Sequence, residues 1–482
     1  MRSVLQNVEP KVIWKHFDAI SNIPRASKKE AKVREYVVGE AKRLGLPCTV
    51  DAVGNVVVRK PAAKGRESAP VTALQGHLDM VCEKNEGTAH NFDKDPIGMR
   101  REGEWLYATG TTLGSDNGVG VAAAMAVMES TDIKHPAMEF IFTIDEETGL
   151  TGAAEFAEGV LKAKYFLNLD NEEKGTICIG CAGGVNTKTW TKVKLGAPKG
   201  KAAYRIKVFG LRGGHSGVDI HLGRGNAVRI LGRALQVIGE KLKIEIGELK
   251  GGSAHNAIPR EAWAIVTADK AKEADLKKLV AGFSADMKAD LGAFDPEVEL
   301  SVEKAKAPKK VFAGADAKRV INLLATLHHG VLAMSPDIPG LVQTSTNVAT
   351  VSCSGNRVEV ITSQRSAIAP CRDMAARVVA TVCRMAGFEV EHGGGYPGWK
   401  PEPDSDLVKI ARKVHEKTLG NDPKLIAMHA GLECGVIGEK NPGMQMISFG
   451  PQIENPHSPR ERVEIPSVEG FWKLLKAVLE AV

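Results

Sequence analysis

The spacing of hydrophobic and polar residues changes near residue 185. Before that point, uninterrupted apolar runs predict buried strands, and residues with helical spacing lie between them. The predicted strands cover 55–59, 70–75, 138–144 and 165–169, and the predicted helices cover 29–44 and 116–129. Strands that alternate with helices are typical of an α/β layer with a mostly parallel, buried sheet.

Between residues 185 and 395, the predicted strands alternate apolar and polar positions instead. These strands cover 203–209, 262–267 and 358–362, and amphipathic helices cover 226–242, 273–291, 317–328 and 373–386. Such alternation is expected of an antiparallel sheet that exposes one face to water. This part of the chain therefore predicts an α+β domain.

A stretch rich in glycine and proline, residues 393–401, predicts a connector. Beyond it, helical segments at 406–419, 431–437 and 466–479 resemble the first part of the chain again. We therefore expect one α/β domain, made of residues 1–184 and 396–482, that is interrupted by an inserted domain of residues 185–395. The glycines at 183–184 and 393–395 are placed to serve as hinges.

Length, composition and charge are those of an ordinary globular protein. The 482 residues suggest about three domain-sized units, and 43% of them are hydrophobic. A net charge of +6 on a chain of this length does not indicate nucleic-acid binding. The longest apolar stretch, residues 119–128, is far shorter than the roughly 20 residues of a membrane-spanning helix. The N-terminus lacks the apolar segment of a secretory signal, so we expect no membrane attachment or export.

The eight cysteines are scattered and have apolar neighbours, which predicts reduced thiols in a cytoplasmic protein. One pair, Cys178 and Cys181, has the spacing of a redox or zinc motif. Because no second such pair exists and this pair lies in a strand-like apolar run, we interpret it as structural.

Acidic residues and a histidine follow the predicted strands, at the point where each strand ends. They are His77 and Asp79 after the strand at 70–75, Asp145, Glu146 and Glu147 after the strand at 138–144, Asp170 after the strand at 165–169, and Asp116 at the start of the helix at 116–129. In an open parallel sheet, ligands bind outside the carboxyl ends of the strands. We therefore expect these side chains to meet at one edge.

Such a cluster of acidic groups needs cations. Carboxylates within a few Å of one another repel, and they take up protons unless a cation neutralises them. Imidazole and carboxylate ligands suit Zn²⁺, and similar ligands accept Co²⁺ or Mn²⁺. The anionic groups are too many for one tetrahedral ion, whereas two ions about 3.5–4 Å apart and bridged by a carboxylate would bind them all. We expect two divalent metal ions.

Four segments look like the metal motifs of the M20 family of di-zinc metallopeptidases. They are GHLDM at 76–80, GSDNG at 114–118, DEETG at 145–149 and NLD at 168–170. Further matching segments are LRGGHSG at 211–217, HNAIPR at 255–260, YPGW at 396–399, HAGLECG at 429–435 and the segment 450–459. The resemblance extends over the whole chain and is strongest to the bacterial aminoacyl-histidine dipeptidases. Ser115 is a departure, since the family pattern leads us to expect alanine there.

The resemblance implies a role for each residue of the cluster. The bridging ligand would be Asp116, one metal would be completed by His77 and Asp170, and the other by Glu147 and His457. A cis peptide bond is implied between Asp116 and Asn117. Glu146 would be the general base that takes a proton from the attacking water and passes it to the leaving amine. Asp79 would hydrogen-bond the second nitrogen of His77 and fix its tautomer.

The resemblance also implies a mixed-sheet, phosphorylase/hydrolase-like catalytic domain interrupted by a lid and dimerisation domain. In the lid, His215 would stabilise the oxyanion, and Asn256 and Arg365 would bind the free carboxylate of a dipeptide. His221, His255 and His429 are candidates for lining the substrate pocket. The expected activity is hydrolysis of unblocked dipeptides, including Xaa-His dipeptides such as β-alanyl-histidine, by a cytoplasmic homodimer that closes around its substrate.

Parts of the sequence also suggest other functions. A deacylase of N-acyl amino acids from the same superfamily stays open, because only substrate profiling separates it from a dipeptidase. A dinucleotide-binding dehydrogenase does not fit, because GSDNGVG at 114–120 departs from G-x-G-x-x-G and places an acid where a pyrophosphate would bind. A serine hydrolase is disfavoured because GHSG at 214–217 lacks the G-x-S-x-G spacing. A non-enzymatic peptide-binding protein is disfavoured because Glu146 and all five candidate ligands are present.

Overall fold

The computed structural model describes all 482 residues, and their contacts divide the chain into two compact units. Unit 1 consists of Met1–Gly180, Trp399–Ala427 and Leu432–Val482, and unit 2 consists of Cys181–Gly398 and Met428–Gly431. The assignment of Met428–Gly431 to unit 2 was not expected from the sequence. None of the helices combines the length and the apolar character needed to cross a membrane.

Unit 1 is built on an eight-stranded mixed sheet. Its strands, in spatial order, are β1 (Cys48–Val50), β2 (Val56–Lys60), β6 (Met138–Thr143), β3 (Thr72–His77), β7 (Tyr165–Asn168), β23 (Gln445–Ser448), β8 (Thr176–Cys181) and β22 (Lys424–Met428). The central strands β6, β3, β7 and β23 run parallel, and β2 and β8 flank them in the antiparallel direction. Every residue of β3, β6 and β7 is buried, which explains why their sequences are continuous apolar runs.

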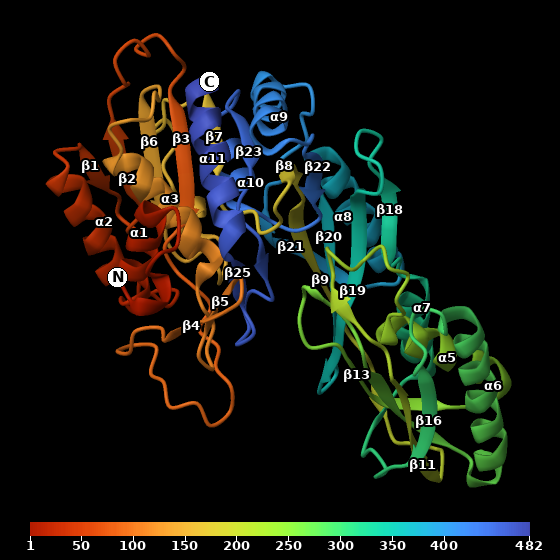
Figure 1. Cartoon of the computed structure of the whole chain (residues 1–482). Helices are drawn as coiled ribbons and strands as arrows, with labels where there is room; N and C mark the ends of the chain where they lie inside the picture. The colour runs from red at the N-terminus through yellow and green to blue at the C-terminus, as the bar shows by residue number, and fades with distance from the viewer. The chain divides into compact units, whose positions relative to one another are not determined.

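Helices and a smaller sheet complete unit 1 (Figure 1). The helices are η1 (Ser3–Leu5), α1 (Lys11–Ser21), α2 (Ala31–Arg43), α3 (Ser115–Glu129), α4 (Thr151–Glu155), α9 (Asp406–Leu419), α10 (Glu433–Glu439) and α11 (Ile465–Ala481). The second sheet contains, in order, β24 (Ile453–Glu454), β25 (Arg462–Glu464), β5 (Trp105–Ala108) and β4 (Met99–Glu102). Helix α3 packs between α1 and β3, and all of its residues from Ser115 to Met128 are buried. A helix that is apolar all round belongs in such a position.

Unit 2 is built on a nine-stranded antiparallel sheet. Along its main path the strands are β16 (Glu299–Lys304), β11 (Ala202–Phe209), β15 (Ala262–Ala268), β13 (Glu245–Gly251), β19 (Val342–Ser354), β20 (Arg357–Ser366), β9 (Gly183–Lys192) and β21 (Glu389–Tyr396), and β18 (Gly330–Met334) pairs with β19. Two short pairs are β10 (Leu195–Gly196) with β17 (Val311–Phe312) and β12 (Gly214–His215) with β14 (Ala257–Ile258). The strands predicted from the alternation of apolar and polar residues do pair in antiparallel fashion.

The helices of unit 2 are α5 (Ala227–Lys241), η2 (Lys270–Lys272), α6 (Glu273–Leu291), α7 (Gly314–Thr326) and α8 (Ala369–Met385). Figure 1 shows α5, α6 and α7 together beside the half of the sheet that contains β11 and β16. Helix α8 packs against the other half, at β9, β20 and β21. Apolar side chains of the helices and strands form one continuous core. The predicted helices agree with the observed ones to within a few residues.

The glycines expected to act as connectors lie in strands instead. Gly183 and Gly184 pair with β20, and Gly393 pairs with Asn186 of β9. A Cβ atom at Gly184 would collide with the Tyr396 ring. Glycine is required here because the chain passes so close to Tyr396. The predicted connector at 393–401 is thus strand as far as Tyr396, and the role of these glycines as hinges stays a prediction.

Candidate metal centre

Three neighbouring parallel strands of unit 1 end at the candidate metal centre. Strand β3 ends at His77, β6 leads into Glu146 and Glu147, and β7 leads into Asp170. Asp116 lies at the start of α3, and its peptide bond to Asn117 is cis, as expected. These polar side chains therefore lie outside the carboxyl ends of the strands, where open α/β sheets bind their ligands.

The carboxylate of Asp116 lies between two histidines. Its Oδ1 is 3.1 Å from Nε2 of His77, and its Oδ2 is 3.0 Å from Nε2 of His457. The His77 Nε2 is also 3.4 Å from Oδ1 of Asp170, and the His457 Nε2 is 3.0 Å from Oε2 of Glu147. Two ligand groups that share Asp116 result, one with His77 and Asp170 and one with Glu147 and His457.

The pKa values of these groups reflect the crowding of their charges. Hydrogen bonds to Asp116 and Glu147 raise the pKa of His457 to about 11. Burial would lower the pKa of His77, but the Asp170 charge and the hydrogen bond to Asp116 raise it well above its usual value. Burial raises the pKa of Asp170 to about 6. The cluster therefore attracts positive charge, which a divalent cation would supply.

The donor set fits a divalent transition metal. Buried Oε1 of Glu147 and Oδ1 of Asp170 have no hydrogen-bond partner, although buried polar atoms are normally satisfied. Imidazole nitrogens and carboxylate oxygens are the ligands that such ions prefer. The Nδ1 of His77 is 3.4 Å from Oδ1 of Asp79, so Nε2 is the nitrogen that faces the ligand cluster.

Glu146 lies beside the cluster and is partly buried. Its carboxylate belongs to a group of potential ligands with His77 and Glu147. Its pKa is raised well above the usual value, first by burial and then by the charges of Asp170, Glu433 and Glu147. A carboxylate in such surroundings has a strengthened affinity for a proton, as a general base requires.

Asp79 holds the turn that contains Glu146 and Glu147. Its Oδ1 accepts the Glu146 N–H at 3.1 Å, and its Oδ2 accepts the Glu147 N–H at 3.2 Å and the Ser27 hydroxyl at 2.7 Å. The side chain is fully buried. The sequence suggested a contact to His77 alone, so these backbone contacts were missed.

In unit 2, Arg365 lies among polar groups with little negative charge nearby. The guanidinium is buried, donates to the Tyr396 hydroxyl, and reaches Ser216 Oγ at 3.5 Å, and its Nε has no partner. An arginine with unused donors is suited to bind a carboxylate. Asn256, by contrast, is exposed, and only its backbone carbonyl contacts this region, accepting the Ser216 N–H.

Two histidines accompany Arg365 in unit 2. Nδ1 of His215 accepts the Val218 N–H at 3.1 Å, so Nε2 carries the proton when the ring is neutral. Burial, together with the Arg365 charge, lowers the pKa of His215 to about 4. Burial and Arg365 likewise lower the pKa of His429 to about 3, and its Nε2 lies 2.7 Å from the Ser345 hydroxyl. The other two pocket candidates, His221 and His255, are exposed.

A family model decides the classification. The model for peptidase family M20/M25/M40 matches residues 73–481. The chain belongs to this peptidase family. The cytosol non-specific dipeptidase of Escherichia coli (strain K12) is 37% identical over 481 residues, which are 100% of this chain and 99% of that protein.

Solved structures agree with the assignment to the M20 family. The crystal structure of the aminoacylhistidine dipeptidase from Vibrio alginolyticus matches with a TM-score of 0.92 and 40% identity, over 100% of this chain and 98% of that one. Aminopeptidase PepT from Bacillus cereus matches with a TM-score of 0.57 and 17% identity, over 98% of this chain and 99% of that one, and shows the shared fold. Family membership and the ligand cluster together support the use of a divalent metal by this M20 peptidase.

A buried polar network, not foreseen from the sequence, lies behind the ligands of the M20 peptidase. The Ser448 hydroxyl donates to Asn168 at 2.5 Å, the Asn168 amide donates to Gln75 at 2.6 Å, and the Gln75 amide donates to Glu433 at 2.5 Å. The Thr143 hydroxyl also donates to Glu433, at 2.7 Å. The bonds lead through Asn168 and Gln75 to the Glu433 carboxylate, so the network joins β23, β7, β3 and β6 to α10. Polar residues at the last positions of apolar strands were a sequence signal for it.

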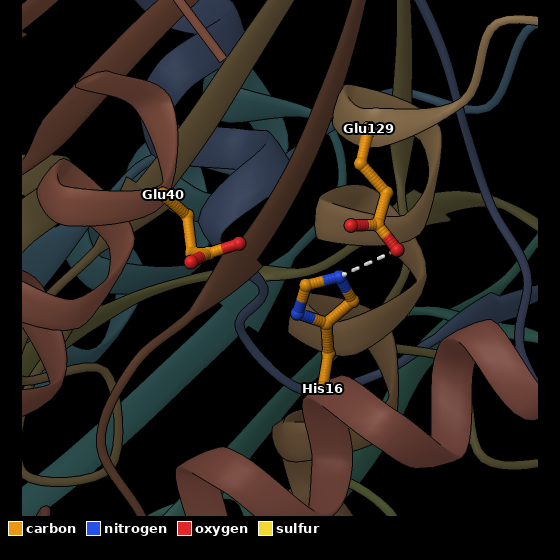
Figure 2. Close-up of side chains that lie close together, drawn as sticks. All are labelled: His16, Glu40 and Glu129. Atoms are coloured by element: carbon orange, nitrogen blue, oxygen red, sulfur yellow. Dashed lines mark ion pairs between the residues drawn. The ribbon is translucent and has the colours of Figure 1, made fainter. Parts of the chain in front are cut away.

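A second histidine–carboxylate cluster of unit 1 lies outside this centre. Figure 2 shows His16 pointing toward Glu129, with Glu40 nearby, and the His16 Nε2 is 3.4 Å from Glu129 Oε1. Lys15 lies 2.8 Å from Glu129, and Arg43 lies 2.7 Å from Glu40. Two cations therefore balance the two carboxylates, which is the organisation of an ion-pair network and leaves no negative charge for a metal.

Proposed function

We propose that this M20 peptidase is a dipeptidase that hydrolyses unblocked dipeptides, including Xaa-His dipeptides such as β-alanyl-histidine. The observation that carries the proposal is the Asp116 carboxylate, each oxygen of which faces a different histidine. Support for the substrate class comes from the printed names of the relatives, a non-specific dipeptidase and an aminoacylhistidine dipeptidase. The cytosolic description of the first supports a cytoplasmic location.

Two Zn²⁺ ions would occupy the two ligand groups. Asp116 would bridge them, His77 and Asp170 would complete one site, and Glu147 and His457 the other. When bound, such ions polarise the peptide carbonyl and lower the pKa of water to about 7. The shared carboxylate and the unsatisfied oxygens of Glu147 and Asp170 support this arrangement.

Glu146 would act as the general base of the reaction. It takes a proton from the attacking water and returns it to the nitrogen of the leaving amino acid. Asp79 holds the Glu146 backbone and so keeps the carboxylate directed at the reacting water. Glu146 is suited to this role because it lies beside the ligand cluster and its raised pKa strengthens its affinity for a proton.

Unit 2 would be the lid and dimerisation domain, and unit 1 the catalytic domain. The His215 Nε2–H would donate to the oxyanion that forms on the peptide carbonyl. Arg365, with Asn256, would bind the free carboxylate of the dipeptide. The unpartnered donor of Arg365 supports its role, since a buried charged group normally has its donors satisfied. The active enzyme would be a homodimer that closes around its substrate.

A substrate panel with defined metals tests the proposal. The protein, freed of metal and reloaded with Zn²⁺, Co²⁺ or Mn²⁺, would be assayed on dipeptides, on tripeptides, on N-blocked dipeptides and on N-acetyl amino acids. We expect hydrolysis of free dipeptides, its loss on chelation and its return with two equivalents of metal. Preferential hydrolysis of N-acetyl amino acids would instead identify an aminoacylase. Peptide hydrolysis that survives complete chelation would contradict the proposal.

A further inference from the structure

Glu461 makes an unusual number of contacts to the segment that carries Asp116. Its Oε2 accepts the N–H groups of Leu113 at 2.8 Å and Gly114 at 2.9 Å. Its Oε1 accepts the Ser115 N–H at 2.7 Å, the Ser115 hydroxyl at 2.6 Å and the Asp116 N–H at 3.3 Å. The side chain is 2% exposed, so water does not compete for these five bonds.

These contacts satisfy the backbone of a segment that has no helical partners of its own. Asp116 and Asn117 depart from helical φ and ψ, so the regular turns of α3 begin only after them. Buried backbone N–H groups outside regular structure need acceptors. Glu461, 345 residues further along from Asp116, supplies both carboxylate oxygens as acceptors.

Arg25 binds the same segment through the backbone carbonyl of Gly114. Its guanidinium donates to the carbonyl oxygens of Leu78 at 2.9 Å, Asp79 at 2.7 Å and Gly114. Arg25 is 2% exposed. Gly114 has a left-handed backbone (φ 68°), and a Cβ atom there would collide with Arg25. The residue must be glycine, and both polar groups of its backbone are held by buried charged side chains.

Glu461 also lies four residues after His457. The backbone N–H of Glu461 donates to the Ser458 carbonyl at 2.9 Å, so the residues that follow His457 form a turn. The Glu461 side chain therefore attaches the turn that follows His457 to the segment that carries Asp116, while Arg25 joins the Asp116 segment to the end of β3, which carries His77. Asp116 has to face both histidines at once, and these contacts set its direction.

We propose that Glu461, assisted by Arg25, is a positioning residue that directs the two carboxylate oxygens of Asp116 at His77 and His457. The inference rests on the proposed function, in which Asp116 bridges two metals. It also gives Ser115 a role, because its hydroxyl supplies one of the five bonds to Glu461. Serine in place of the expected alanine thus strengthens the attachment of Glu461 to the Asp116 segment.

The test compares Glu461→Gln with Glu454→Gln. Glutamine keeps one acceptor oxygen but places a donor against N–H groups that need an acceptor. Glu454 belongs to the same segment but pairs with Arg462 near the surface, so it is a matched control. Metal affinity would be measured by competition with a chelator, alongside kcat, KM and Tm.

We expect Glu461→Gln to lose about 10–100-fold in metal affinity and to lose kcat more than KM. Glu454→Gln should stay within about twofold of the wild type, since exposed ion pairs contribute little. A folded Glu461→Gln protein with wild-type metal affinity would overturn the inference. Lost stability alone, with metal affinity intact, would identify a purely structural role and overturn it equally.

If Glu461→Gln does not fold, Ser115→Ala tests the positioning role of Glu461 instead. Removing one of the five bonds should lower metal affinity about two- to tenfold with the fold intact. Unchanged affinity would then overturn the inference. Failure of the proposed function would be distinguishable, because the wild-type protein itself would then bind no metal or hydrolyse no dipeptide.

Discussion

The Asp79 carboxylate accepts the backbone N–H of Glu146 at 3.1 Å. A buried acid that lies two residues beyond one candidate ligand thus fixes the turn that contains the candidate general base. Asp79 would not attack the substrate, yet its hydrogen bond would determine where the proton acceptor, Glu146, lies. Its replacement should therefore affect chemistry more than stability.

Asp79→Asn tests this relationship. The amide retains one acceptor, so either Glu146 or Glu147 loses its partner, and we expect kcat to fall about 10–100-fold, the cost typical of groups that orient metal ligands. Asp51→Asn is the matched control, because Asp51 accepts the N–H groups of Val53, Gly54 and Asn55 in a turn that carries no candidate ligand. Asp51→Asn should lower the free energy of unfolding by about 1 kcal/mol and leave kcat unchanged. Equal kcat in the two variants would contradict the positioning role of Asp79.

Glu146→Gln should fold and bind metal but lose kcat by about 10²–10⁴-fold. The amide has the shape of the carboxylate, yet it cannot accept a proton at neutral pH, and general-base catalysis has this magnitude. Metal content measured on the same sample that is assayed separates lost chemistry from lost metal. Near-normal turnover of the metal-loaded variant would remove Glu146 from the mechanism.

His457→Ala should reduce the bound metal from two equivalents to about one. Only one of the two ligand groups contains His457, whereas Asp116 belongs to both. Asp116→Ala should therefore lose both ions under the same conditions. Elemental analysis after dialysis against a defined free metal concentration measures the difference. Two retained ions in His457→Ala would place the second site elsewhere.

Arg365→Met should raise KM for dipeptides about 10–100-fold, because a charge-assisted hydrogen bond contributes about 1.5–3 kcal/mol. Dipeptide amides, which lack the carboxylate, should bind the wild type as weakly as they bind the variant. Arg372→Met is the control, since Arg372 donates to the Tyr396 carbonyl and pairs with Asp373. If Arg365→Met weakens dipeptides and their amides alike, Arg365 does not bind the carboxylate.

His329 should make unit 2 sensitive to acid. Burial, with the charge of Arg229, lowers its pKa to about 3, and Nδ1 lies 3.2 Å from the amide nitrogen of Asn226, the cap of α5. That nitrogen donates, so Nδ1 accepts and the folded protein resists its protonation.

The unfolded chain takes up this proton first, near the ordinary histidine pKa of about 6.5. The contribution of His329 to the free energy of unfolding is therefore complete above about pH 6.5. As the pH falls toward 3, the free energy of unfolding decreases by about 1.4 kcal/mol per pH unit. His329→Gln should be less sensitive to pH in this interval, as measured by denaturant unfolding at several pH values. His328→Gln, at the exposed neighbouring histidine, should retain the wild-type slope.

The sequence predicted best where local pattern and chemistry coincide. The apolar runs that become β3, β6 and β7 are buried on both faces, so their type and bounds could be predicted closely. The rule that ligands bind at the carboxyl ends of such strands then predicted where His77, Glu147 and Asp170 would meet. The antiparallel strands of unit 2 were likewise recognisable from alternation.

Contacts between distant segments could not be predicted in this way. Nothing in the local pattern around Arg25 or Glu461 distinguishes them from charged surface residues, since their partners are backbone groups far along the chain. The strand pairing of Gly183, Gly184 and Gly393 could not be predicted, because composition does not separate flexibility from close packing. The assignment of Met428–Gly431 to unit 2 could not be predicted either, because so short a segment does not change the periodicity of the sequence.

The order of the ligands along the chain has a consequence for synthesis. Asp116 and its second histidine partner, His457, lie 341 residues apart along the chain. A nascent polypeptide that does not yet include His457 thus has no complete centre, however well its earlier strands have folded. Activity against peptides would begin only after the segment that carries His457 has emerged and docked, so translation itself delays the onset of proteolysis.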